Sequence, residues 1–164
     1  NIVTENIEID LEENYRFLYL VGSGSSYNAA KQVAYTMQKI IKIPVIAKYP
    51  FEIKEELFSL PSKTLVVGIS QSGASVSTHD ALKYAKTTGC RTLALAGERD
   101  SYIGKEADYC ILLGIPSENA GPKTLGYTIT KLRLLQLAYY LKRRSLPEEY
   151  KNLSNQYNLV LDNV

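Results

Sequence analysis

The sequence predicts an α/β fold: a three-layer αβα sandwich with a five-stranded parallel sheet of flavodoxin-like order 2-1-3-4-5. Two observations support this prediction. Five short runs are apolar throughout, as expected of strands that are buried on both faces, and segments of helical periodicity alternate with them. The length of 164 residues suits one full-sized domain and is too short for two. Right-handed crossovers then bring the turns after the first and third strands together at the carboxyl edge of the sheet.

The expected elements follow from these patterns in chain order. Strands are expected at residues 17–21, 45–47, 65–69, 91–96 and 109–113. Helices are expected at residues 26–41, 52–58, about 73 to 88, 101–106 and 127–144, with Gly89 ending the third. Residues 1–15 are interpreted as a lead-in segment, 16–145 as the domain, and 146–164 as a C-terminal helix or linker. The helix over 127–144 is apolar nearly all round, which favours burial against a second domain or a second copy.

The central stretch of the chain is residues 64–77, TLVVGISQSGASVS. A buried strand leads through a Ser/Gly turn into a helix, so backbone N–H groups and the helix dipole point at one spot that suits a phosphate. Four hydroxyl groups lie close together there, those of Ser70, Ser72, Ser75 and Ser77. The alternative is an ordinary serine N-cap, with the other serines merely forming a turn.

The turn after the first strand, Gly22-Ser23-Gly24, does not continue as a nucleotide-binding fingerprint. The third glycine of GxGxxG is replaced by Tyr27, and no acidic residue closes the second strand at Ala47-Lys48-Tyr49. The phosphate-binding pattern GxxxxGK[ST] is absent from the sequence. The remaining hydroxyl and N–H donors suit a small phosphorylated polyol, and we expect no cofactor. The polar loop 115–126 leaves the same edge, so Glu118, Asn119, Lys123 and Thr124 either face a ligand or form a solvated connector.

Composition narrows the remaining function classes. A net charge of +2 gives no sign of nucleic acid binding, and no apolar run is long enough for a membrane span. The single histidine, His79, is interpreted as a surface helix residue, and a His-based metal cluster is set aside. Cys90 and Cys110 are expected to be buried free thiols of a cytoplasmic protein. Because the chain begins at Asn1 without methionine, we expect a piece of a longer protein.

Three motifs together resemble the SIS (sugar isomerase) domain family: GSGSSYNAA at 22–30, SQSGASVST at 70–78 and AGPKTLGYTITK at 120–131. The resemblance is nearest to the first SIS domain in the isomerase half of glucosamine-6-phosphate synthase, and to the fructosamine-phosphate deglycases. It implies that the second turn binds a sugar phosphate and that the first turn reaches the sugar. The residues so implied are Gly24, Ser25, Ser26, Ser70, Gln71, Ser72, Gly73 and Ser75.

The resemblance also shows where this chain departs from the family. Ala74 replaces an acidic residue, and the helix after the first turn offers Gln32 and Lys39 rather than a carboxylate. Glu52, Glu118 and His79 remain the candidates for the base that sugar isomerisation needs, and the catalytic residues stay unknown. We expect half of a two-domain isomerase, aminotransferase-like enzyme or deglycase, paired with a second SIS domain or as a homodimer. The alternative is a non-catalytic sugar-phosphate sensor in a regulatory protein.

Overall fold

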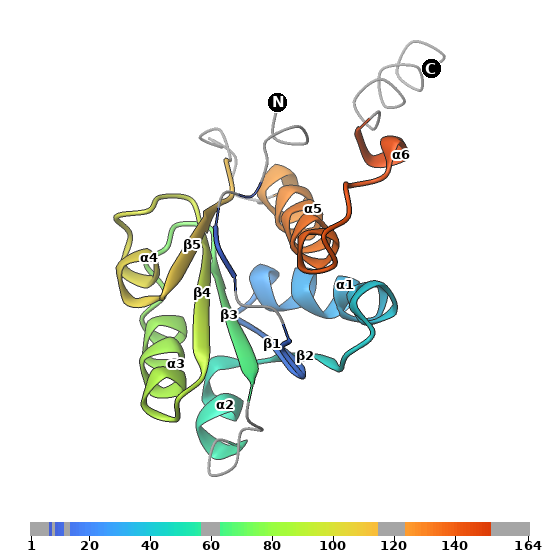
Figure 1. The fold of residues 1–164 in the computed structure, drawn as a ribbon. Coiled ribbons are helices and arrows are strands. Elements are labelled where there is room, and N and C mark those ends of the chain that lie inside the picture. The colour runs from blue at the N-terminus through green and yellow to red at the C-terminus, as the bar shows by residue number, and fades with distance from the viewer. Residues whose placement is uncertain (1–6, 8, 12–13, 57–62, 115–123, 152–164) are drawn as a thin grey trace.

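The computed structural model describes residues 7, 9–11, 14–56, 63–114 and 124–151. Its centre is one parallel sheet of order β2-β1-β3-β4-β5, which confirms the predicted fold class and strand order (Figure 1). The strands are β1 (Phe17–Gly22), β2 (Val45–Lys48), β3 (Thr64–Ser70), β4 (Arg91–Ala96) and β5 (Tyr109–Leu112). Each lies within one or two residues of its predicted range.

Helices cover both faces of this sheet. On one face lie α1 (Ser25–Ile41) and α5 (Thr124–Leu141), and on the other lie α2 (Pro50–Glu56), α3 (Val76–Thr87) and α4 (Tyr102–Glu106) (Figure 1). A short helix, α6 (Glu148–Lys151), follows α5. The helices divide the core into two parts, one on each side of the sheet.

The alternation of side chains along the strands explains the two cores. Leu18 and Leu20 of β1 pack on the side of α1 and α5, whereas Tyr19 and Val21 pack on the side of α3. Every residue of the central strand β3 is buried, because helices cover it from above and below. The continuous apolar runs in the sequence therefore reflect strands with no face open to water.

Several predicted helix boundaries were shifted. Helix α5 begins at Thr124 and ends at Leu141, three residues earlier than expected at each end. It ends there because Arg143 adopts a left-handed conformation (φ 52°) and the Arg144 N–H donates back to the Tyr139 carbonyl, 3.0 Å away. The expected helix over 146–164 is present only as α6 within the described residues, and 152–164 lie outside them. No helix is seen in the described part of the lead-in.

Helix α5 buries most of its apolar surface within the chain itself. Ile129, Leu134 and Leu137 join the core on the α1 side of the sheet. A charged side chain is buried with them: Arg133 is 3% exposed, and its Nε donates to the Leu113 carbonyl at the end of the sheet, 3.4 Å away. Its Nη1 donates to Gln136 Oε1 at 3.1 Å. The chain thus covers much of the surface from which a partner was expected.

None of the helices described here combines the length and the apolar character that crossing a bilayer requires.

Candidate phosphate-binding site

The turns that follow β1 and β3 meet at the carboxyl edge of the sheet. The two strands are neighbours, with Gly22 in register with Ile69 at their ends. The hydroxyl groups of Ser23 and Ser77, 54 positions apart in the sequence, lie 3.5 Å from one another. The predicted juxtaposition of the two serine-rich turns is confirmed.

Four hydroxyl groups form a continuous line across the junction, here called the hydroxyl row: Ser23, Ser77, Ser75 and Thr78. Ser77 Oγ lies 3.3 Å from Ser75 Oγ, which in turn lies 2.9 Å from Thr78 Oγ1. Ser75 is also the N-cap of α3, where its Oγ accepts from the Thr78 N–H at 3.4 Å. The ordinary capping role and membership of the row therefore coexist in Ser75.

The start of α1 adds backbone donors to the same edge. Gly24 is its N-cap residue and forms no side-chain cap hydrogen bond, and the first helical turn contains no acidic residue. N–H groups at such an end have no partner inside the helix, and the helix dipole makes them favourable for an anion. Neither turn, residues 22–28 or 70–78, contains an aspartate, glutamate, lysine, arginine or histidine. Any anion held here would depend on hydroxyl and N–H groups.

The second turn is held by β4 and α4 as well as by its own strand. Gly73 has a left-handed conformation (φ 69°), and its N–H donates to the Ser70 carbonyl at 3.0 Å. Its carbonyl accepts from the Ile103 N–H at 3.0 Å, and a Cβ at this position would lie 2.1 Å from Ser101 Cβ. The Gln71 carbonyl accepts from the Gly97 N–H, also at 3.0 Å. Only glycine fits this turn without displacing α4.

The Gln71 side chain extends to the first turn of α5. A Cβ on Gly126 would lie 2.5 Å from Gln71 Nε2, so the amide packs directly on the helix backbone. The second turn, α4 and the start of α5 are therefore in contact through Gln71 and Gly73. The third motif of the sequence, which includes Gly126, therefore contacts the second.

The eight residues implied as ligand contacts do not share one environment. Gly24, Ser25 and Ser72 are exposed, whereas Ser26 and Ser70 are only 7% and 6% exposed. Gly73 shapes the turn, and Ser75 caps α3. Sequence reasoning did not select Ser23; it counted Ser77 among the four hydroxyl groups of the second turn but not among the eight residues that the resemblance implies, and the structure places both at the junction. The available signal was the position of Ser23 between two glycines and of Ser77 in the first turn of a helix.

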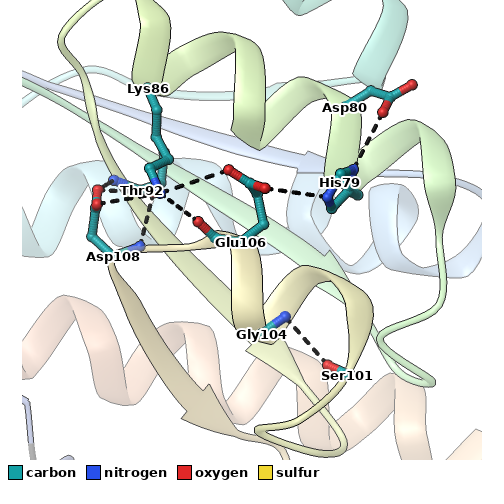
Figure 2. A network of polar contacts seen from close by, with 8 residues as sticks. All are labelled: His79, Asp80, Lys86, Thr92, Ser101, Gly104, Glu106 and Asp108. Atoms are coloured by element: carbon teal, nitrogen blue, oxygen red, sulfur yellow. Dashed lines mark hydrogen bonds and ion pairs between the residues drawn. The ribbon is translucent and has the colours of Figure 1, made fainter.

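The described candidates for a catalytic base are engaged elsewhere. Glu52 Oε2 accepts from the Tyr49 N–H at 2.6 Å, at the start of α2. His79 points toward α4: its Nε2 faces Glu106 Oε2 at 3.2 Å, and its Nδ1 faces Asp80 Oδ1 at 3.3 Å (Figure 2). Its side chain is 13% exposed, so the interpretation as a surface histidine was wrong. Glu118, Asn119 and Lys123 lie outside the described residues, and Thr124 is exposed at the start of α5.

The network around His79 joins α3, α4 and β4 (Figure 2). Lys86 Nζ lies 3.6 Å from Glu106 Oε1 and 3.8 Å from Asp108 Oδ1. Asp108 Oδ2 accepts from the N–H and the hydroxyl of Thr92 at 2.8 and 2.9 Å. These contacts fix α4, and with it Ser101, against the second turn.

The two cysteines are free and buried, as predicted. Burial raises the pKa of the Cys90 thiol, an effect partly offset by the Thr88 hydroxyl, which donates to Sγ at 3.4 Å. Burial likewise raises the pKa of Cys110, partly offset by the charge of Arg99. In the described part of the chain, no three His, Cys, Asp or Glu residues are grouped so that they could hold a metal ion.

Comparison with known proteins assigns the fold to a family. The SIS domain family matches residues 14–141. The chain belongs to the SIS domain family. Glutamine–fructose-6-phosphate aminotransferase [isomerizing] of Fusobacterium nucleatum is 30% identical over 98% of this chain and 29% of its own length. The same-named protein of Clostridium tetani is 32% identical over 85% of this chain and 23% of its own length.

Solved structures agree with this assignment. A candidate phosphosugar isomerase of Clostridium difficile 630 superposes with a TM-score of 0.75 and 35% identity, over 91% of this chain and 43% of that one. Glucosamine-6-phosphate deaminase of Thermotoga maritima also has a TM-score of 0.75, at 25% identity over 84% of this chain and 43% of that one. The chain thus spans less than a third of the length of these curated relatives and less than half of these solved chains.

Proposed function

We propose that this SIS domain binds a phosphorylated sugar or amino sugar at the junction of its two serine-rich turns, as part of an isomerase, aminotransferase-like enzyme or deglycase. The contact between Ser23 and Ser77 is the observation that carries the proposal, since it unites the donors of both turns at one edge. The names of the relatives support the ligand class, because they refer to fructose 6-phosphate, glucosamine 6-phosphate and phosphosugars.

The donors available at the junction match a phosphate monoester. The exposed Ser25 and Ser72 hydroxyls can each donate to a phosphate oxygen, and so can N–H groups that begin α1 other than that of Ser26, which donates to the Ser23 carbonyl at 3.2 Å. A hydrogen bond to a charged group contributes about 1.5–3 kcal/mol, so three such bonds suffice for binding without an adjacent lysine or arginine. An unphosphorylated sugar lacks the charge that these donors stabilise.

We assign the proton-transfer step of such an enzyme to residues beyond this site. His79 and Glu52 are already paired away from the hydroxyl row. Ring opening and proton transfer need a base within hydrogen-bond reach of the sugar. A second SIS domain or a second copy of the chain would supply that group, in a cytoplasmic enzyme. If the partner supplies none, the domain acts as a sensor of the same ligand.

Thermal unfolding with fructose 6-phosphate tests the ligand class. At a ligand concentration of about 100 times Kd, we expect stabilisation of about 2.7 kcal/mol, which raises Tm by roughly 5–10 °C for a domain of this size. Ser72→Ala should weaken binding about 10- to 100-fold, because it removes one charge-assisted hydrogen bond. Far-ultraviolet circular dichroism follows the transition.

Ser145→Ala is the matched control, since Ser145 is an exposed serine just beyond the C-terminal end of α5. It should leave the ligand-induced shift unchanged. An equal shift with fructose alone, or an undiminished shift in Ser72→Ala, would contradict the assignment of the phosphate to these turns.

A further inference from the structure

An aromatic stack lies where the chain leaves β1 and β2. It consists of Tyr27 in the first turn of α1, Tyr49 after β2, and Phe51 in the first turn of α2. The Tyr27 and Tyr49 ring centroids are 3.9 Å apart, and those of Tyr49 and Phe51 are 5.7 Å apart, with interplanar angles of 24° and 15°. Because Tyr49 follows β2, the strand beside β1, the stack lies at the same carboxyl edge as the serine-rich turns.

The two ends of the stack differ in exposure. Lys31 Nζ lies over the Tyr27 ring, 5.8 Å from its centroid, and Tyr27 and Tyr49 are half-buried. Phe51 is 63% exposed. The packing between α1 and the β2–α2 turn explains the two tyrosines, but it does not need a large apolar ring at the open end. Exposed apolar groups gathered beside polar donors are typical of a ligand site.

The packing of α2 against α3 places Phe51 level with Ser77. Both helices return from the carboxyl edge, so they run in the same direction, and Lys54 Nζ of α2 lies 3.9 Å from Asp80 Oδ2 of α3. Phe51 precedes Lys54 by three positions, and Ser77 precedes Asp80 by three. Residues three apart share a helix face, so Phe51 and Ser77 occupy matching positions one turn nearer the edge. Val76, 62% exposed, adds a second apolar side chain there.

We infer that the aromatic stack receives the carbon skeleton of the phosphorylated sugar whose phosphate lies at the serine-rich turns. The inference rests on the proposed function and specifies its ligand: a sugar phosphate of hexose size, rather than phosphate or a short phosphate ester. The C–H groups of a sugar are attracted to the electron-rich face of an aromatic ring, and they displace water from it. The serine-rich turns hold the phosphate, and Phe51 holds the apolar face of the sugar.

Calorimetric titration of the chain with fructose 6-phosphate and with inorganic phosphate tests this division. We expect the wild-type chain to bind fructose 6-phosphate at least about tenfold more tightly than phosphate, from the apolar area covered on the stack. Phe51→Ala should bind fructose 6-phosphate about fivefold more weakly than the wild-type chain and should bind phosphate equally well. Phe51→Tyr, which keeps the ring, should restore it. Ser72→Ala should weaken both ligands.

Tyr35→Ala provides a matched control. Tyr35 is 66% exposed, carries a lysine over its ring (Lys39 Nζ, 4.5 Å), and lies in the middle of α1. It should change neither affinity. Saturation-transfer NMR adds a direct readout: irradiating aromatic protons should saturate the sugar C–H protons in the wild-type chain and much less in Phe51→Ala.

The outcomes separate the two proposals. Three results would overturn the role of the stack while leaving the phosphate site in place. They are an unchanged fructose 6-phosphate affinity in Phe51→Ala, an equal loss of affinity for both ligands in that variant, and an equal affinity of the wild-type chain for both ligands. Binding of neither ligand to the wild-type chain would overturn the proposed function, and this inference with it.

Discussion

Replacing Gly73 with alanine tests the shape of the second turn. Two costs add in this variant. The left-handed conformation (φ 69°) costs an alanine about 1–2 kcal/mol. The new Cβ would lie 2.1 Å from Ser101 Cβ and 2.2 Å from Ser101 Oγ, an overlap that typically costs a further 1–3 kcal/mol. We therefore expect the free energy of unfolding to fall by about 2–5 kcal/mol.

Gly89→Ala separates the two costs. Gly89 is also left-handed (φ 81°), but nothing lies within 4 Å of a Cβ placed there. It should lose only the conformational part, about 1–2 kcal/mol. Urea denaturation followed by circular dichroism gives both values under the same conditions.

A double-mutant cycle with Ser101→Gly isolates the overlap. Ser101 caps α4 through its Oγ, which accepts from the Gly104 N–H at 3.3 Å, and glycine at an N-cap costs only a few tenths of a kcal/mol (~0.3). In the Ser101→Gly background, Gly73→Ala should cost no more than Gly89→Ala. Equal losses for Gly73→Ala and Gly89→Ala in the otherwise wild-type chain would refute the close packing of the turn on α4.

Two further predictions concern the hydrogen bonds between Asp108 and Thr92 and the two buried thiols. Asp108→Ala removes the acceptor of two hydrogen bonds from Thr92 and should lower the free energy of unfolding by about 2–3 kcal/mol. The side chain of Asp80 is 47% exposed, so Asp80→Ala should lower the free energy of unfolding by less than about 1 kcal/mol. Similar losses in the two variants would contradict this prediction. Cys90 and Cys110 should react with a thiol reagent only as fast as the chain unfolds. Rapid labelling of the native chain would contradict this. Burial raises the pKa of both thiols in the folded chain above 9.0, so their contribution to the free energy of unfolding is complete below the pKa of the unfolded chain and is lost as the pH rises through the pKa of the folded chain.

The fold was predictable because the relevant patterns are local. Each strand is a short, unbroken apolar run, and their alternation with helices leaves few topologies. The same logic predicts that the turns after β1 and β3 lie side by side. Helix ends were less predictable. Helix α5 ends at Leu141 because the backbone of Arg143 is left-handed, and the pattern of leucine and lysine, which continues past Leu141, does not predict that conformation.

The site was predictable in outline only. Which serines meet depends on packing between residues far apart in the sequence, as with Ser23 and Ser77. The burial of Ser26 and Ser70 and the pairing of His79 with Glu106 have the same origin. The position of a residue in a helix predicts which face it occupies. It does not predict which residue of another helix, such as Glu106, 27 positions after His79, will pack against that face. The roles of the eight implied residues in binding stay a prediction until ligand is added.

The buried guanidinium of Arg133, near the middle of α5, has a consequence for the first turn of that helix. A helix that is apolar nearly all round packs comparably well at several rotations about its axis. A shift of one residue in the position that faces the sheet corresponds to a rotation of about 100°. The bond to the Leu113 carbonyl selects one rotation. Gly126 lies seven positions earlier, about two turns away on the same side, where it meets Gln71. An arginine two helical turns away thereby sets the angle at which the third motif meets the second serine-rich turn.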